Sequence, residues 1–155
     1  MNGADIVAIL LIIVFGAVGS VLGSIRTLII FLGMFFAYSL TNGMISGEDI
    51  APKMNYIGTY LGIFIGSIVI ALLVYGYSKA TIIESMEGVF GFILGALTGW
   101  GIAKFIFTIF LVYHSDTSFA AMIGSGTIAW QVFNVGPYQA FLDRTKDLRE
   151  PKTIY

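Results

Sequence analysis

The chain has 155 residues, of which 57% are hydrophobic and only 11% are charged, and its formal net charge at pH 7 is −1. A soluble domain carries about 25% charged residues, so this composition excludes an ordinary soluble enzyme. The chain has no cysteine, one histidine and no basic patch, which excludes a disulfide framework, a thiolate or multi-histidine metal site and a nucleic-acid partner.

Long stretches without any Asp, Glu, Lys or Arg dominate the chain. They cover residues 6–25, 27–47, 54–78, 88–103 and 117–142. Uncharged apolar stretches of roughly 20 residues are typical of transmembrane helices. We therefore predict an all-α integral membrane protein with about four transmembrane helices, an interfacial amphipathic helix and a charged tail.

The first two predicted helices cover about residues 5–22 and 27–45. Only Arg26 interrupts the uncharged stretch between them, and one straight helix through both would be roughly 60 Å long, twice the hydrocarbon core. A turn is therefore needed, and the residues that favour one are Gly19, Ser20, Gly23 and Ser24. We expect a short, tight hairpin of two spans, with a re-entrant hairpin that does not cross fully as the alternative.

The next two predicted helices are separated from their neighbours by polar connections. Residues 46–55 contain Glu48, Asp49, Pro52 and Lys53 and predict a loop. Residues 56–77 predict a third span with tyrosines at both ends, as in the aromatic belts of membrane proteins. Residues 78–87 predict a short polar connection, and residues 88–113 predict a long fourth span. We assign residues 1–113 to the four-span membrane domain.

Residues 114–142 differ from the preceding spans and predict an amphipathic helix in the membrane interface. Asp116 and Ser118 are the expected caps of this helix. Its apolar side chains recur at helical spacing and are candidates for docking on a partner or on lipid: Phe119, Met122, Ile123, Trp130 and Phe133. A fifth span over residues 117–142 is the alternative. Residues 143–155 carry seven charges and predict a solvated, partly disordered tail.

The distribution of Lys and Arg predicts the orientation in the membrane. With four spans, the N-terminus, the 46–55 loop and the tail share one side, which carries five basic residues. The other side carries Arg26 and Lys79. Both termini are therefore expected in the cytoplasm, or in its organellar equivalent.

Many of the 19 glycines are spaced by four residues. The rows are Gly19 and Gly23 in the first predicted helix, Gly58, Gly62 and Gly66 in the third, and Gly91, Gly95 and Gly99 in the fourth. Four residues advance a helix by about 400°, so each row lies on one face, where small residues allow helix backbones to approach closely. We expect the rows of the third and fourth helices to pack on each other within the chain. Packing on a neighbouring chain is the alternative.

Five charged residues near or within the predicted spans are candidates for polar contacts or ion pairs: Asp5, Arg26, Glu84, Glu87 and Lys104. Asp5 is expected to cap the first helix. Arg26 is expected either to anchor the turn at lipid phosphates or to pair with Glu84 or Glu87. For Lys104, snorkelling to the interface is favoured over a role in a buried ion pathway.

No pattern in the sequence predicts catalysis. The sequence contains no recognisable Ser-His-Asp arrangement, no phosphate-binding loop and no pair of intramembrane acids. We therefore predict no catalytic residue, no cofactor-binding residue and no metal ligand, and a protein that is not an enzyme.

These features together resemble the colicin V production protein family of bacterial inner-membrane proteins, over roughly residues 4–133. The matching residues are Asp5 at the start of the first span, Gly19, Gly23 and Arg26 at the turn, Glu87 before Gly91, Gly95 and Gly99, and the amphipathic stretch 125–133. The chain departs from the family's pattern at Thr27, where an acidic residue is usual, and at Thr98, where an arginine is usual. The resemblance implies a role in toxin production or export, or in envelope homeostasis.

Three functions are compatible with these observations. The first is an accessory or scaffold subunit of a larger membrane assembly, with membrane lipid and other membrane protein subunits as partners. The second is a small homo-oligomeric channel or transporter, in which Lys104 would set the charge of the pore. The third and least favoured is a lipid enzyme that uses His114 and Asp116.

Overall fold

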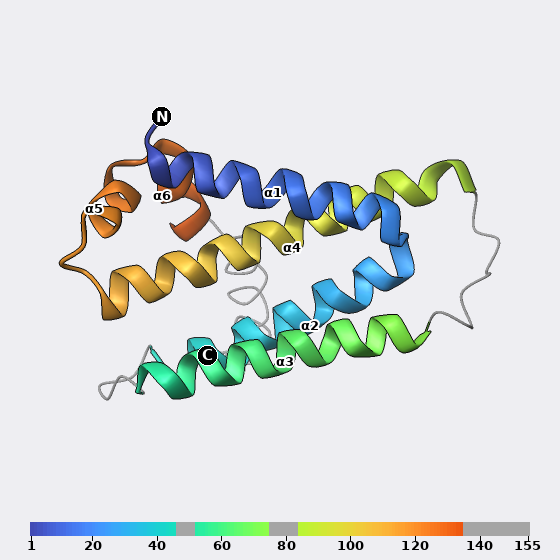
Figure 1. Cartoon of the computed structure of the whole chain (residues 1–155), viewed down its shortest axis with the longest axis horizontal. Coiled ribbons are helices and arrows are strands. Elements are labelled where there is room, and N and C mark those ends of the chain that lie inside the picture. Colours follow the sequence, from blue (N-terminus) through green and yellow to red (C-terminus); the bar gives the residue numbers. More distant parts are fainter. Residues whose placement is uncertain (46–51, 75–83, 135–155) are drawn as a thin grey trace, which may run out of the picture.

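A computed structural model of the chain describes residues 1–45, 52–74 and 84–134, without the side chains of residues 84 and 85. Within these ranges the chain forms helices and no strand (Figure 1). The helices are α1 (Gly3–Leu22), α2 (Ser24–Asn42), α3 (Lys53–Leu73), α4 (Glu84–Tyr113), α5 (Ser118–Ser125) and α6 (Thr127–Asn134).

Four of these helices are long and apolar enough to cross a membrane, which confirms the predicted all-α membrane fold. They are α1, α2, α3 and α4, and they run back and forth between two ends of the molecule (Figure 1). Helix α4 begins at Glu84, four residues before the predicted start. Its 30 residues correspond to a length of about 45 Å.

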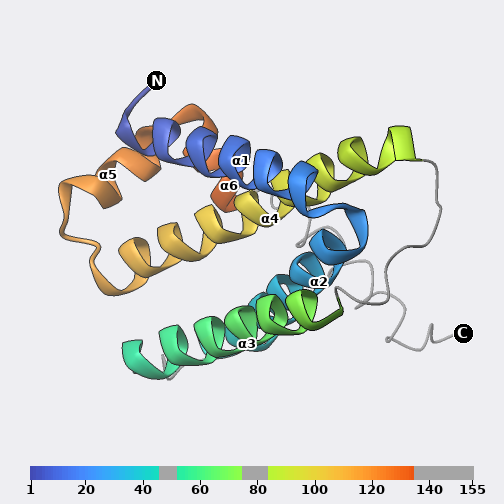
Figure 2. The same ribbon diagram turned by 45° about the vertical axis from the view of Figure 1, so that its right-hand side comes forward.

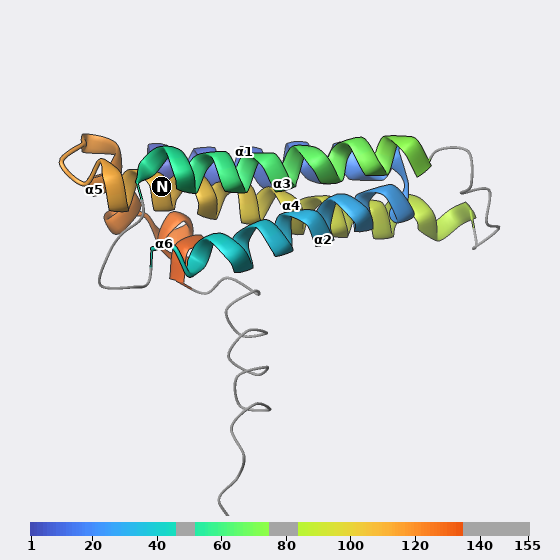
Figure 3. The ribbon, with the colours of Figure 1, turned by 90° about the horizontal axis from the view of Figure 1, so that it is seen from below.

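The four long helices form two pairs, and the pairs do not follow the order of the chain. Helix α1 packs along α4, and α2 packs along α3, while α2 also contacts α4. Figures 1 and 2 show α1 and α2 diverging from their common turn, and Figure 3 shows the bundle from below. The predicted hairpin is therefore tight at its turn but open between its two helices.

Gly23 alone forms the turn between α1 and α2. It ends α1 and precedes α2, with φ 85° and ψ 162°. Backbone angles in this region are essentially restricted to glycine, because a Cβ atom would clash with the neighbouring peptide groups. Gly19 and Ser20, which we had included in the turn, lie within α1.

Two hydrophobic cores hold the bundle together. The first joins α1, α4, α5 and α6 around Ala8, Ala103, Phe107, Ile123 and Val132. The second joins α2, α3 and α4 around Met34, Tyr38, Tyr56, Tyr60 and Phe105. Helix α4 contributes to both cores and is thus the element that connects the two pairs.

Residues 118–134 form two short helices in place of the single amphipathic helix that we predicted. Each has eight residues, about 12 Å in length, so neither supports the alternative of a fifth span. The N-cap of α5 is Thr117, whose hydroxyl accepts a bond from the Ala120 N–H, and not Asp116 or Ser118. The predicted tail, residues 143–155, lies outside the described residues.

Candidate functional site

Asp5 joins the start of α1 to the start of α6. Its Oδ1 accepts hydrogen bonds from the backbone N–H groups of Ile128 and Ala129, each at 2.9 Å, and its Oδ2 accepts one from the Asn2 N–H at 3.0 Å. The side chain is only 1% exposed. The N-cap residue of α1 is Asn2, and Asp5 contributes to the cap of its own helix, as expected, through a capping box with Asn2. In addition, Asp5 satisfies the first free N–H groups of α6.

Further polar contacts surround this junction. The Asn2 amide donates to the Met122 carbonyl oxygen at 2.5 Å and lies 3.2 Å from the Ser125 hydroxyl. A Cβ atom on Gly126 would lie 2.7 Å from Asp5 Oδ1, so glycine leaves room for the carboxylate. One feature of the sequence pointed to a capping role for Asp5, because an acid stands directly before a charge-free run. The sequence did not identify α6 as the helix that Asp5 contacts.

The glycine row of α4 packs directly on the backbone of α1. A Cβ atom would overlap the Gly19 carbonyl oxygen if added to Gly91, and the Phe15 carbonyl oxygen if added to Gly95. At Gly99 it would overlap the carbonyl oxygen of Leu11. The row thus lets α1 and α4 approach to backbone contact, as predicted for small residues, but its partner is α1 and not α3.

The glycine row of α3 faces outward. A Cβ atom added to Gly58, Gly62 or Gly66 would meet no atom of the described chain within 4 Å. The buried side of α3 is formed by other residues, among them Tyr56, Tyr60 and Ser67. Our expectation that the rows of the third and fourth helices face each other is therefore wrong.

Single glycines outside these rows also fit close contacts that we had not predicted. A Cβ atom on Gly33 of α2 would overlap the Ser67 side chain of α3, and one on Gly101 of α4 would overlap Met34 of α2. These glycines have no partner glycine four residues away on their helices. Without such a repeat, nothing in the sequence distinguishes them from ordinary helical glycines.

Lys104 is buried between α4 and α2. Its side chain is 4% exposed, and its Nζ lies 4.9 Å from the centre of the Tyr38 ring, an arrangement that permits a cation–π interaction. The expectation that Lys104 snorkels to the interface is therefore wrong. The nearby Tyr60 ring stacks on Phe105 at 3.7 Å between centroids, and Phe105 also stacks on Tyr56. This cluster was not predictable from the sequence, because tyrosines at the ends of a span are also typical of an interfacial belt.

Lys53 and His114 meet at the end of the bundle where α3 begins and α4 has just ended. The Lys53 ammonium contacts His114 Nε2. His114 had been considered together with Asp116 as the only residues that support a lipid enzyme. His114 therefore has a partner at the start of α3. A contact of this kind fixes the end of a helix, here the end of α4.

Arg26 and Glu87 lie at the opposite end of the bundle, beside the Gly23 turn. Both line a cavity of about 520 Å³, together with residues of α1 around Leu22. A Cβ atom on Gly23 would lie 2.9 Å from Glu87 Oε1. Arg26 and Glu87 thus line the same cavity, which is compatible with the predicted alternative of a pair between them, whereas the side chain of Glu84 lies outside the described residues.

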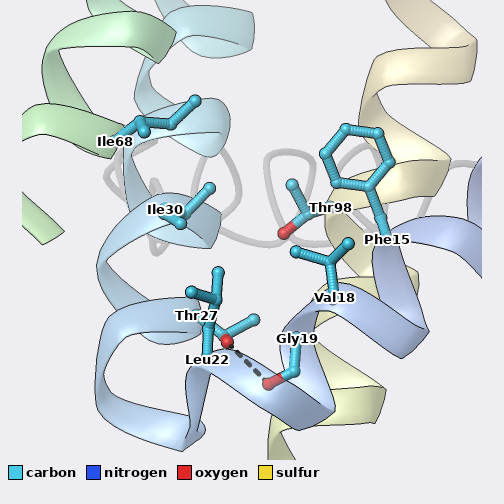
Figure 4. A pocket seen from close by; sticks show the side chains of 9 residues that line it. Phe15, Val18, Gly19, Leu22, Thr27, Ile30, Ile68 and Thr98 are labelled. Atoms are coloured by element: carbon cyan, nitrogen blue, oxygen red, sulfur yellow. Dashed lines mark hydrogen bonds between the residues drawn. The ribbon is translucent and has the colours of Figure 1, made fainter. Parts of the chain in front are cut away.

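An apolar cleft of about 150 Å³ continues from this end into the bundle, between the α1–α4 pair and the α2–α3 pair (Figure 4). Its lining residues are Phe15, Val18, Gly19, Leu22, Thr27, Ile30, Ile68, Gly95 and Thr98. The two hydroxyls of this cleft are already bonded to backbone carbonyls, that of Thr27 to Gly23 at 2.7 Å and that of Thr98 to Leu94 at 2.9 Å. The cleft therefore presents hydrocarbon to any occupant.

Most of the residues predicted to dock on a partner pack within the chain. Ile123 is fully buried, Phe119 lies edge-on to Phe110 at 4.8 Å, and Phe133 packs against the first core. Only Met122 and Trp130 of the predicted set are exposed. The prediction that all five form a docking surface is therefore wrong for Ile123, whereas Phe119 and Phe133 are partly buried within the chain.

Among the residues that the structure describes, no three His, Asp or Glu side chains gather to hold a metal ion. The arrangements found in the described residues include a carboxylate that caps a helix, close helix contacts at glycines, a buried lysine over a tyrosine ring, a lysine–histidine contact, and a cleft with a charged mouth. Searches against protein-family models, curated proteins and solved structures found no match to this chain, so its functional assignment rests on these contacts.

Proposed function

We propose that this multi-span membrane protein is a non-catalytic accessory or scaffold subunit of a larger membrane assembly. The observation that supports this proposal is the outward row of Gly58, Gly62 and Gly66 on α3, which contacts no other described part of the chain. A helix of another membrane protein subunit is the proposed partner of this face.

The two triple rows provide an internal comparison. In α4 the spacing of four residues brings the backbone of α1 into contact, whereas in α3 the same spacing faces away from the bundle. Each glycine in a helix interior costs about 0.5–1 kcal/mol relative to alanine. In α3 no contact within the described chain offsets this cost, and close packing of a partner helix would offset it.

The surroundings of the row fit a helix partner. Leu61, Ile65 and Val69 are exposed on the same side of α3 as the glycines. Large side chains beside a row of glycines form a ridge next to a groove, which is the shape that a second helix complements.

The resemblance to the colicin V production protein family supports a more specific proposal for the assembly. We place it in a bacterial inner membrane, with a role in toxin production or export or in envelope homeostasis. The basic residues of the sequence support an orientation with both termini in the cytoplasm.

The mass of the particle that contains the chain tests the proposal. The chain is extracted gently from its native membrane, either unchanged or with Gly62→Phe on α3 or Val14→Phe on α1. Both positions are exposed, so both variants are expected to fold. We expect a large particle with other polypeptides for the unchanged chain and Val14→Phe, and a particle of reduced mass for Gly62→Phe.

Two results would contradict the proposal. A monomer without any other polypeptide would exclude an assembly of any kind. A particle made only of copies of this chain would favour the homo-oligomeric channel or transporter, with the α3 row as the contact between copies.

A further inference from the structure

We infer that the end of the bundle at the Gly23 turn binds one phospholipid with a zwitterionic headgroup that carries an ammonium, of the phosphatidylethanolamine class. One acyl chain lies in the apolar cleft, and the headgroup lies in the cavity that Arg26 and Glu87 line. This inference does not depend on the proposed partner of α3, which concerns a different face of the bundle.

The position of the two cavities matches an amphiphilic molecule. The Arg26–Glu87 cavity lies at the turn, where the chain passes from one span to the next, and therefore at the level of the membrane surface. The cleft continues from Leu22, which lines both cavities, through Val18 to Phe15, one turn of α1 after another. Polar lining thus occurs at the headgroup level and apolar lining at the depth of the acyl chains.

The cleft fits hydrocarbon in both chemistry and size. Its two hydroxyls, on Thr27 and Thr98, already donate to carbonyls of their own helices and need no polar occupant. A dry apolar cavity of roughly 150 Å³ accommodates a molecule such as benzene, so the cleft can hold a segment of about six carbon atoms. Figure 4 shows Val18 and Phe15 of α1 on one side of the cleft and Ile30 of α2 and Ile68 of α3 on the other.

The charges at the mouth select the headgroup. The Arg26 guanidinium complements a phosphate, because it is a permanent cation that carries five N–H donors. The Glu87 carboxylate complements a primary ammonium, which donates charge-assisted hydrogen bonds. A headgroup with phosphate alone would leave Glu87 beside a second negative charge, and a quaternary ammonium would offer it no N–H donor.

The test is a lipid titration of the full chain in detergent, followed by native mass spectrometry of the lipid-bound species. The three probes are dioleoyl phosphatidylethanolamine, phosphatidylglycerol and phosphatidylcholine. We expect the first to bind about tenfold more tightly than phosphatidylglycerol, a difference of about 1.4 kcal/mol, because only its ammonium donates charge-assisted hydrogen bonds to Glu87. Equal binding of the three lipids, or preference for phosphatidylglycerol, would overturn the inference.

Two variants locate the site. Glu87→Gln is expected to abolish the preference for phosphatidylethanolamine over phosphatidylglycerol, and a preference that persists would exclude Glu87 as the ammonium ligand. Val18→Phe fills the cleft and is expected to weaken all three lipids. Its matched control is Val14→Phe, because Val14 and Val18 are 52% and 45% exposed on α1 but only Val18 lines the cleft. Identical lipid binding by these two variants would place the acyl chain elsewhere.

Discussion

The carboxylate of Asp5 lies 2.9 Å from the backbone nitrogen of Ile128, although the two residues are 123 positions apart in the chain. This bond fastens the first span to the short helices that follow the last span. It makes a buried acid part of the tertiary structure of a membrane protein whose predicted spans contain few charges.

Replacing Asp5 by Ala is expected to destabilise the protein by about 1–3 kcal/mol, because the buried N–H groups of Ile128 and Ala129 lose their acceptor. Asp5→Asn keeps an acceptor and is expected to cost less. Unfolding in a denaturing detergent measures the free energy, and hydrogen exchange of residues 118–134 reports the release of α5 and α6. Asp116→Ala serves as the control because Asp116 is exposed. If Asp5→Ala matches this control, the contact does not stabilise the fold.

The two triple glycine rows are expected to respond oppositely to alanine. Gly95→Ala places a Cβ atom against the Phe15 carbonyl and is expected to destabilise the bundle by about 1–3 kcal/mol. Gly58→Ala meets no atom of the described chain and is expected to stabilise the isolated monomer by up to about 1 kcal/mol, because alanine favours helix. Unfolding of the purified monomer compares the two. A similar loss of stability in both variants would show that α3 is packed differently.

The turn at Gly23 is expected to tolerate no side chain. Gly23→Ala forces a Cβ atom into a backbone conformation with φ 85° and ψ 162° and is expected to cost about 1–3 kcal/mol. Gly43→Ala is the matched control, because Gly43 has φ −63° and ψ −24°, where alanine is unstrained. Thermal unfolding followed by circular dichroism distinguishes the two variants. Equal midpoints would mean that the strained angles of Gly23 are not required.

The interaction of Lys104 with the Tyr38 ring can be isolated with a double-mutant cycle. Lys104→Met, Tyr38→Leu and the double variant are expected to give a coupling free energy of about 1–2 kcal/mol, because the ammonium lies over a buried ring. Tyr38→Phe retains a ring face and is expected to preserve most of this coupling. A coupling near zero in denaturant unfolding would assign the stability of the region to packing alone.

The spans were predictable because hydrocarbon thickness imposes a length and excludes charge, and both constraints are visible in the sequence. The partner of each helix was not predictable. Gly58 and Gly91 both begin triple rows with the same spacing, yet one row contacts α1 and the other faces outward. Spacing defines a face of a helix, but which surface meets that face depends on the whole bundle.

The candidate sites were also predictable only in part: the position of a residue along its span was predictable, but its partner on another helix was not. The location of Arg26 and Glu87 on one side was predictable, since four alternating spans place the first turn and the start of the fourth span there, but the cavity that they line was not. The burial of Lys104 was not, because its aromatic partner Tyr38 lies on another helix. Ile123 was misassigned to a docking surface because a helix that packs on a neighbour and a helix that lies on lipid have the same apolar periodicity.

The pairing of α1 with α4 and α6 has a consequence for the order of events during synthesis. The first span leaves the ribosome before any of its packing partners exists, and the N–H group that Asp5 binds follows 123 residues later. At a rate of about 5–20 residues per second, this delay is on the order of 6–25 seconds. Throughout that interval the Asp5 carboxylate of the nascent first span has none of the α6 N–H groups that it accepts from in the folded chain.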